Sequence, residues 1–147
     1  MVMTYNQLGF AFTGLRTVSF AKIDAAHKKT GGINLVTGLS FGLDIDDHTV
    51  TCTTEFSFEK KTDQPFLILK VQGLFEIDKN DFLNKMKQDD GSYLVTQGLA
   101  THFAVLTVGS ARGILHAKTE GTTYNQYLLP TMDIKVMVQD DIILNNK

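Results

Sequence analysis

The stretch Ser92–Glu120 constrains the fold more than any other part of the chain. It has the length of a helix, its first residue is a good N-cap, and Gly121 supplies a stop signal. Between Tyr93 and Ala117 the only full charge is that of Arg112. A helix that is apolar on most of its circumference must be buried on more than one side. We therefore expect a long helix wrapped by other parts of the protein.

A stripe of small residues runs along this expected helix, with one member at every fourth position. Its members are Val105, Gly109, Gly113 and Ala117. Glycine costs about 1 kcal/mol relative to alanine inside a helix, which is tolerable where another backbone packs closely. A bulkier stripe on the opposite flank suits a sheet and contains Leu99, Phe103, Leu106 and Ile114. Two apolar faces imply two packing partners, so we expect the small stripe to face a second subunit, with a purely intrachain partner as the alternative.

A membrane span is the rival interpretation of the same stretch, because residues 93–111 carry no charge and are nearly long enough to cross a bilayer. Several polar side chains would need hydrogen-bond partners in lipid, namely Thr96, Gln97, Thr101, His102, Thr107 and Ser110. A buried helix without membrane insertion is therefore the better expectation.

Length and charge limit the class of protein. A chain of 147 residues corresponds to about one domain, so residues 1–147 are expected to form a single domain that buries about 68–70% of its unfolded surface. The net charge of −2 gives no electrostatic attraction to nucleic acid. The N-terminal residues lack the basic and apolar blocks of a signal peptide, and the single Cys52 suits a reducing compartment. We therefore expect a cytoplasmic location.

Alternating apolar and polar residues predict four strands in the first half of the chain. They span residues 7–13 with an extension to Phe20, then 39–46, 49–59 and 66–77, and a loop is expected over 21–37. Short connections between the last three strands favour an antiparallel meander. Together with the long helix, this predicts an α+β fold with a four-stranded antiparallel sheet and the helix packed on one face.

Two further segments are less regular. Residues 78–88 form an amphipathic pattern with Asp78 as N-cap and predict a short helix. Residues 132–144 fit a strand alternation and a helical stripe equally well, so the period alone does not decide between them.

No arrangement of residues typical of catalysis or metal binding is present. His102 and His116 lie 14 residues apart, about 21 Å along a helix, and cannot share a metal ion. Cys52 occupies an apolar position of a strand, where a buried thiol is expected. We therefore predict no catalytic residue, no metal site, no cofactor and no enzymatic activity. The alternative is a small-molecule-binding or hydrolytic cup in which Asp44, His48 or His102 would have to converge.

Apolar surface is the remaining functional feature. The strands between residues 41 and 77 are rich in phenylalanine, and apolar residues occupy both phases of residues 66–69. Such a surface can form a groove for apolar segments of other chains. The expected polypeptide-binding residues are Phe41, Leu43, Phe56, Phe58, Phe66, Ile68 and Phe75.

Several short motifs, in this order, resemble the SecB-like export chaperones. Ala111-Arg112 and residues 120–122 are similar to the end of the family's long helix and the turn after it. The run Tyr127–Ile134 (YLLPTMDI) is similar to the segment that follows, and Phe66–Ile77 is similar to the fourth strand. The first strand is also similar, so the resemblance extends from about residue 8 to residue 138.

The resemblance implies a four-stranded antiparallel sheet, a long helix on one face and a shorter C-terminal helix. It also implies a homotetramer built as a dimer of dimers, with the long helices between the sheets. The implied function is an ATP-independent chaperone that holds unfolded polypeptides in apolar grooves for export or folding. The expected partners are unfolded clients and further copies of the chain.

Four features depart from the export members of that family. The net charge is only −2, and Lys70 stands in the fourth strand where the family's acidic sheet surface carries an acid. The long helix contains no proline, and no motor-binding tail precedes Lys147. Coupling to the translocation motor is therefore not expected. A dedicated client, such as the antitoxin of a toxin–antitoxin system, fits better, and a structural assembly protein without clients is a further alternative.

Overall fold

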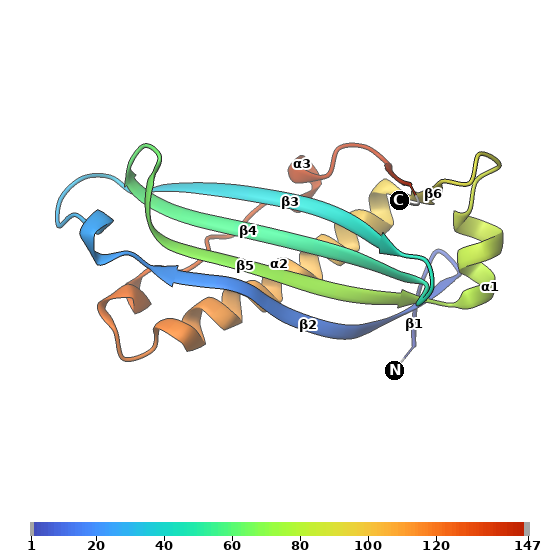
Figure 1. Cartoon of the computed structure of the whole chain (residues 1–147), viewed down its shortest axis with the longest axis horizontal. Helices are drawn as coiled ribbons and strands as arrows, with labels where there is room; N and C mark the ends of the chain where they lie inside the picture. Colours follow the sequence, from blue (N-terminus) through green and yellow to red (C-terminus); the bar gives the residue numbers. More distant parts are fainter. Residues whose placement is uncertain (1, 146–147) are drawn as a thin grey trace.

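Long alternating segments pair into one curled antiparallel sheet in the computed structural model, which describes residues 2–145 (Figure 1). The strand order is β1-β2-β5-β4-β3. The bounds of these strands are Met3–Tyr5 for β1, Leu8–Lys22 for β2, Asn34–Asp44 for β3, Thr49–Lys61 for β4 and Gln64–Ile77 for β5. The meander β3-β4-β5 agrees with the prediction, and β2 pairs with β5 rather than with its neighbour in sequence, β3.

The prediction of four strands was wrong, because the sheet has five. Asn6 and Gln7 have φ values of 48° and 65°, which is the left-handed backbone of a tight hairpin turn. This turn folds β1 back onto the start of β2. In addition, β3 begins at Asn34, inside the segment expected to be a loop, and its first half pairs with β4.

The long helix α2, Gln97–Thr119, starts four residues later than the sequence predicts, because its N-cap is Thr96 and not Ser92. The preceding residues Tyr93–Val95 instead form β6, which pairs with β7, Ile142–Leu144, in a second, two-stranded sheet. Thr96 is the N-cap, and its hydroxyl accepts a hydrogen bond from the Leu99 amide. Beyond the C-terminus of the helix, Gly121 adopts a φ of 78° and turns the chain.

The short helices sit between these elements. The expected helix at 78–88 is one turn, α1 (Lys79–Asp81), continued by a π turn, η2 (Phe82–Met86), with Asp78 as its N-cap as predicted. The ambiguous segment 132–144 contains both structures, because α3 (Ile134–Met137) precedes β7. Two single turns, η1 (Asp24–Ala26) and η3 (Thr123–Gln126), lie at the opposite end of the molecule.

Small side chains let α2 lie very close to the middle of the sheet. Its buried face includes Ala100, Ala104, Thr107 and Ala111. A Cβ atom on Gly73 of β5 would lie only 2.6 Å from the Thr107 hydroxyl oxygen, so the glycine is what allows this approach. Near the start of the helix, the Phe103 ring stacks on Phe75 with 4.1 Å between ring centroids. The helix contacts chiefly β5 and β4, the central strands.

Three hydroxyl groups on this apolar helix are satisfied by the helix itself. The hydroxyls of Thr107, Ser110 and Thr119 each donate to the carbonyl four residues earlier, at 2.8–2.9 Å. Within residues 2–145, no helix combines the length and hydrophobicity needed to cross a membrane.

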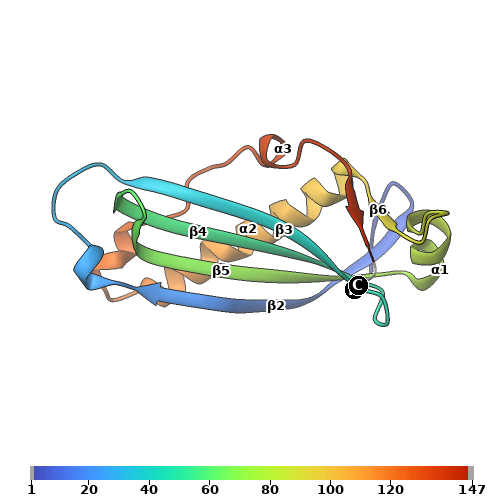
Figure 2. The same cartoon turned by 45° about the horizontal axis from the view of Figure 1, so that its top comes forward.

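Arg112 ties the C-terminal segment to α2. Its Nε donates to the Leu129 carbonyl at 3.0 Å, and its Nη2 donates to the Pro130 carbonyl at 2.9 Å. The chain then runs over the sheet past β3 towards β7 (Figure 2). Arg112, the only full charge between Tyr93 and Ala117, therefore holds a neighbouring segment, and α3 is placed beyond the β3 edge.

Gly73→Ala is expected to lower the free energy of unfolding by about 1–3 kcal/mol, because the new methyl group would push Thr107 and the helix away from the sheet. Chemical denaturation would measure the change. Gly38→Ala is the matched control, since its Cβ would meet only the Glu55 Cβ at an ordinary 3.7 Å. Equal stabilities for the two variants would contradict the close approach of helix and sheet.

Candidate functional site

The helix-facing side of the sheet is wider than the helix that covers it. Helix α2 lies over β5 and β4, so the same face of β2 and of β3 extends beyond it on either side. Apolar side chains continue onto both uncovered flanks, which we call the β2 flank and the β3 flank. These flanks form the candidate site.

The β2 flank consists of Phe12 and Leu15, both of them exposed. Phe12 stacks on Phe75 with 4.7 Å between ring centroids, and Leu15 pairs with Gly73, so both side chains point to the helix side of the sheet. Leu15 keeps 44% of its surface exposed. This flank is therefore apolar surface that the domain does not cover.

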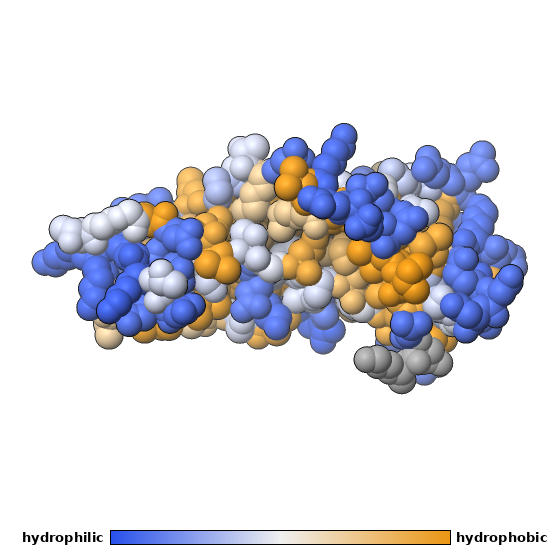
Figure 3. Space-filling model, turned by 90° about the horizontal axis from the view of Figure 1, so that it is seen from above, coloured by the Kyte–Doolittle hydropathy of each residue, from blue (hydrophilic) through white to orange (hydrophobic). Residues whose placement is uncertain are grey.

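The β3 flank consists of half-buried side chains that alternate along the strand, namely Leu35, Leu39, Phe41 and Leu43. Between this flank and the C-terminal segment lies a hollow of about 300 Å³, open to solvent and lined by Leu39, Phe41 and residues 136–140 and 142. Figure 3, seen from the β3 side, shows hydrophobic surface across the middle of the molecule and hydrophilic ends.

The seven residues predicted to bind polypeptide fall into two groups. Phe41, Leu43 and Ile68 are half-buried, with Ile68 on the opposite, outer face of the sheet. The other four are packed in the core of this domain: Phe56, Phe58, Phe66 and Phe75. The residues that sequence reasoning missed are those of the β2 flank, because an exposed and a buried phenylalanine carry the same strand periodicity.

The predicted oligomer stripe lies on the face of α2 that points away from the sheet. Val105 is 48% exposed, and Gly109, Gly113 and Ala117 are exposed as well. A Cβ atom on either glycine would meet nothing within 4 Å. Of the bulkier stripe, Leu99 and Phe103 are buried under the helix while Leu106 and Ile114 are half-buried. The two glycines of the stripe thus face open space among the described residues.

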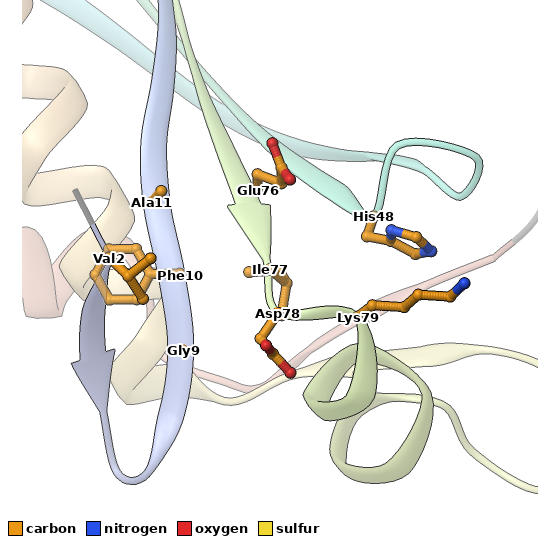
Figure 4. Close-up of a pocket in the computed structure, with 9 residues that line it drawn as sticks. All are labelled: Val2, Gly9, Phe10, Ala11, His48, Glu76, Ile77, Asp78 and Lys79. Atoms are coloured by element: carbon orange, nitrogen blue, oxygen red, sulfur yellow. The ribbon is translucent and has the colours of Figure 1, made fainter.

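The three residues considered for a hydrolytic site do not converge. His48, between β3 and β4, packs edge-on against Phe82, whereas His102 stacks on Tyr5 of β1, at the opposite edge of the sheet. A hollow of about 310 Å³ at the end of β5 contains His48, but neither Asp44 nor His102 lines it (Figure 4). No group of three metal-ligating side chains occurs in the part of the chain that the structure describes.

An aromatic cluster at the far end of the sheet had no signal in the sequence. The His27 ring packs on Phe66 and Tyr124, and its Nε2 is 2.7 Å from the Tyr127 hydroxyl oxygen. The Tyr124 hydroxyl donates to the Asp24 carboxylate, and burial followed by this carboxylate raises the pKa of Tyr124 to about 12. These contacts join segments 100 residues apart and fix η1 against η3.

Together the curled antiparallel sheet, the long helix on one face and the C-terminal segment over the sheet edge define a SecB-like fold. Among solved structures, the chain is similar to the SecB-like chaperone Rv1957 of Mycobacterium tuberculosis, determined in complex with a ChAD peptide from the Rv1956 HigA1 antitoxin. The TM-score is 0.50 at 14% sequence identity, covering 84% of this chain and 90% of that chain. The resemblance inferred from the sequence is thereby confirmed for the fold, of which this chain is a divergent representative.

Sequence comparisons give no closer assignment. No protein-family model matches the chain, and no curated protein matches it.

Cys52 is expected to resist alkylation in the folded protein. Its side chain is fully buried, and burial raises the pKa of the thiol to about 12, so almost no thiolate forms at pH 8. Mass spectrometry after treatment with iodoacetamide should show an unmodified native protein and a singly modified urea-unfolded one. Rapid modification of the native protein would contradict the buried position.

Proposed function

We propose that this protein is an ATP-independent chaperone that holds non-native polypeptides on the apolar flanks beside α2. The observation that carries the proposal is the uncovered helix-facing surface of β2 and β3, on a SecB-like scaffold. Contiguous exposed apolar surface on a folded domain indicates an interaction site. An unfolded segment offers the complementary apolar side chains.

The expected affinity comes from many modest contacts. Burial contributes about 25 cal/mol per Å² of apolar surface, and confinement of the client opposes it. Since Phe12, Leu15 and Phe41 each keep part of their surface in solvent, no one of them supplies strong binding alone. When one segment of a client is bound at one flank, its next segment is held at a high effective concentration near the other flank, which strengthens the overall binding.

A dedicated client fits this chain better than the export motor. The outer face of the sheet pairs Lys70 with Glu55 and Arg16 with Gln72, so it lacks the uniform acidic character expected of a motor-docking surface. The net charge of −2 agrees with this. The neighbour in fold is bound to a peptide from an antitoxin, and we propose an unstable partner protein of this kind as the client.

The protein is expected to suppress aggregation of a chemically denatured test protein at stoichiometric amounts and without nucleotide, as followed by light scattering. Leu15→Ser should weaken binding of a reduced, alkylated test protein by roughly tenfold, because fully burying a leucine is worth about 1.5–3 kcal/mol. Fluorescence anisotropy would measure this affinity.

Val36→Ser is the matched control, because Val36 has a similar exposed fraction, 48%, but its register places it on the outer face of the sheet. It should bind the test protein as the unchanged chain does. Aggregation that proceeds unaltered at excess protein would overturn the proposed function. Equal losses for the two serine variants would move the site away from the β2 flank.

We also propose that copies of the chain assemble through the stripe on α2. Gly109→Leu would place a bulky side chain where two helices meet, so it should lower the native mass from about 65 kDa, four chains of 16.3 kDa, while the far-UV spectrum stays unchanged. Gly32→Leu, in an open loop, is the control. Native mass spectrometry would decide, and an unaltered mass for Gly109→Leu would contradict helix-mediated assembly.

A further inference from the structure

A basic hollow lies at the end of the sheet where η1, the β4–β5 hairpin and η3 come together (Figures 1 and 2). Its volume is about 400 Å³, and three lysines line it, Lys28, Lys29 and Lys60, together with His27 and Tyr127. No aspartate or glutamate is among its lining residues. We call it the lysine hollow. It shares no residue with either apolar flank.

The three ammonium groups have no counter-charge of their own. None of them forms an ion pair within residues 2–145. The acids nearest in sequence are engaged elsewhere, because the Asp24 carboxylate accepts the Tyr124 hydroxyl and the buried Glu59 accepts the Asn34 Nδ2 amide at 3.0 Å. Like charges around one concave surface focus a positive potential there, although the net charge of the chain is −2. The lysine hollow therefore attracts anions.

The loop that carries Lys28 and Lys29 is anchored at its base. The preceding residue, His27, packs on two aromatic rings, and its Nε2 lies 2.7 Å from the Tyr127 hydroxyl oxygen. The Lys28 amide donates to the Ala26 carbonyl at 3.1 Å. Both lysines thus extend from a fixed main chain, which lowers the entropy lost when they close on a ligand.

Lys60 reaches the same hollow from an irregular point in the β4–β5 pairing. The register shifts on both sides of Glu59, and Lys60 has no partner in β5. Pro65 in the facing strand has no amide hydrogen to give to the ladder, so regular pairing is interrupted there. Such irregularities re-aim a side chain. Lys60 is half-buried and lines the hollow, whereas the next residue, Lys61, is exposed and does not.

The donor set suits a phosphate group better than a carboxylate. A terminal phosphate carries about −1.5 to −2 charge at pH 7 and has three acceptor oxygens that spread in three dimensions. Ammonium groups from two separate segments can each meet one of these oxygens as compact point charges. Planar carboxylates are instead matched by the fork of an arginine, and no arginine lines the hollow.

We propose that the lysine hollow binds a terminal phosphate group, held by Lys28, Lys29 and Lys60. The group belongs to a free phosphorylated small molecule or to a phospholipid headgroup, since both present the same chemistry. This site is independent of the proposed chaperone function, because no residue of the flanks takes part. It gives the chain an anion site at the end of the sheet formed by η1 and η3.

The first test titrates inorganic pyrophosphate into the full chain in about 0.15 M salt, followed by calorimetry. Saturable binding is expected, and Lys60→Gln should weaken it by about tenfold through loss of one charge-assisted contact. Lys61→Gln is the matched control from the same hairpin. It should change the affinity by less than about twofold, since a charge outside the site is screened over about 8 Å at this ionic strength. Both variants should keep the far-UV spectrum.

The second test identifies the source of the phosphate. Sedimentation with phosphatidylcholine vesicles, with and without phosphatidic acid, asks whether the chain binds the lipid headgroup. Binding of either pyrophosphate or the phosphatidic acid vesicles that depends on Lys60 supports the site, and the probe that binds names the source. Binding of neither probe would overturn the proposal, as would equal losses for Lys60→Gln and Lys61→Gln. Citrate that binds as tightly as pyrophosphate would also overturn it, because the hollow would then not select phosphate.

Discussion

The close contact between α2 and the centre of the sheet determines the rest of the structure. Gly73 leaves no side chain at the crossing point, and the small residues of the buried helix face let the two backbones approach. A single helix over β5 and β4 is narrower than a sheet of five strands. One sheet face therefore has a covered middle and two apolar margins. The same contact supplies a stable core and leaves the surface that we assign to clients.

The two margins differ in chemistry although both are apolar. The β2 flank presents side chains on an edge that bulges make irregular, so it suits contacts without main-chain pairing. The β3 flank combines half-buried apolar side chains with a hollow that is open to solvent. A client of the proposed kind that touches both would meet exposed apolar side chains on one side and the hollow on the other.

Periodicity correctly predicted the elements whose local sequence preference agrees with the contacts they make in the fold. The strands β4 and β5, the cap at Asp78 and the existence of α2 follow from alternation, capping and apolar length. The features that were missed depend on pairing between residues far apart in the sequence or on a single tight turn. The local sequence of Tyr93–Val95 is compatible with a helix, but pairing with β7 makes it a strand. The strand β1 depends on a two-residue turn that folds it back onto β2. The site was predicted by residue type but not by exposure, because Phe12 and Phe56 follow the same strand pattern and differ only in whether α2 covers them.

Arg112 links the long helix, which belongs to the stable core, to the C-terminal segment that lines the hollow. Its guanidinium donates to two successive carbonyls, those of Leu129 and Pro130, so the chain is held at this point through its main chain. Val136 and Gln139, which line the hollow, are exposed and lie outside the core. Mutations there can alter which clients are preferred at little energetic cost to folding. Related proteins with this fold can thus differ in the polypeptides they prefer to bind while keeping the same sheet and helix.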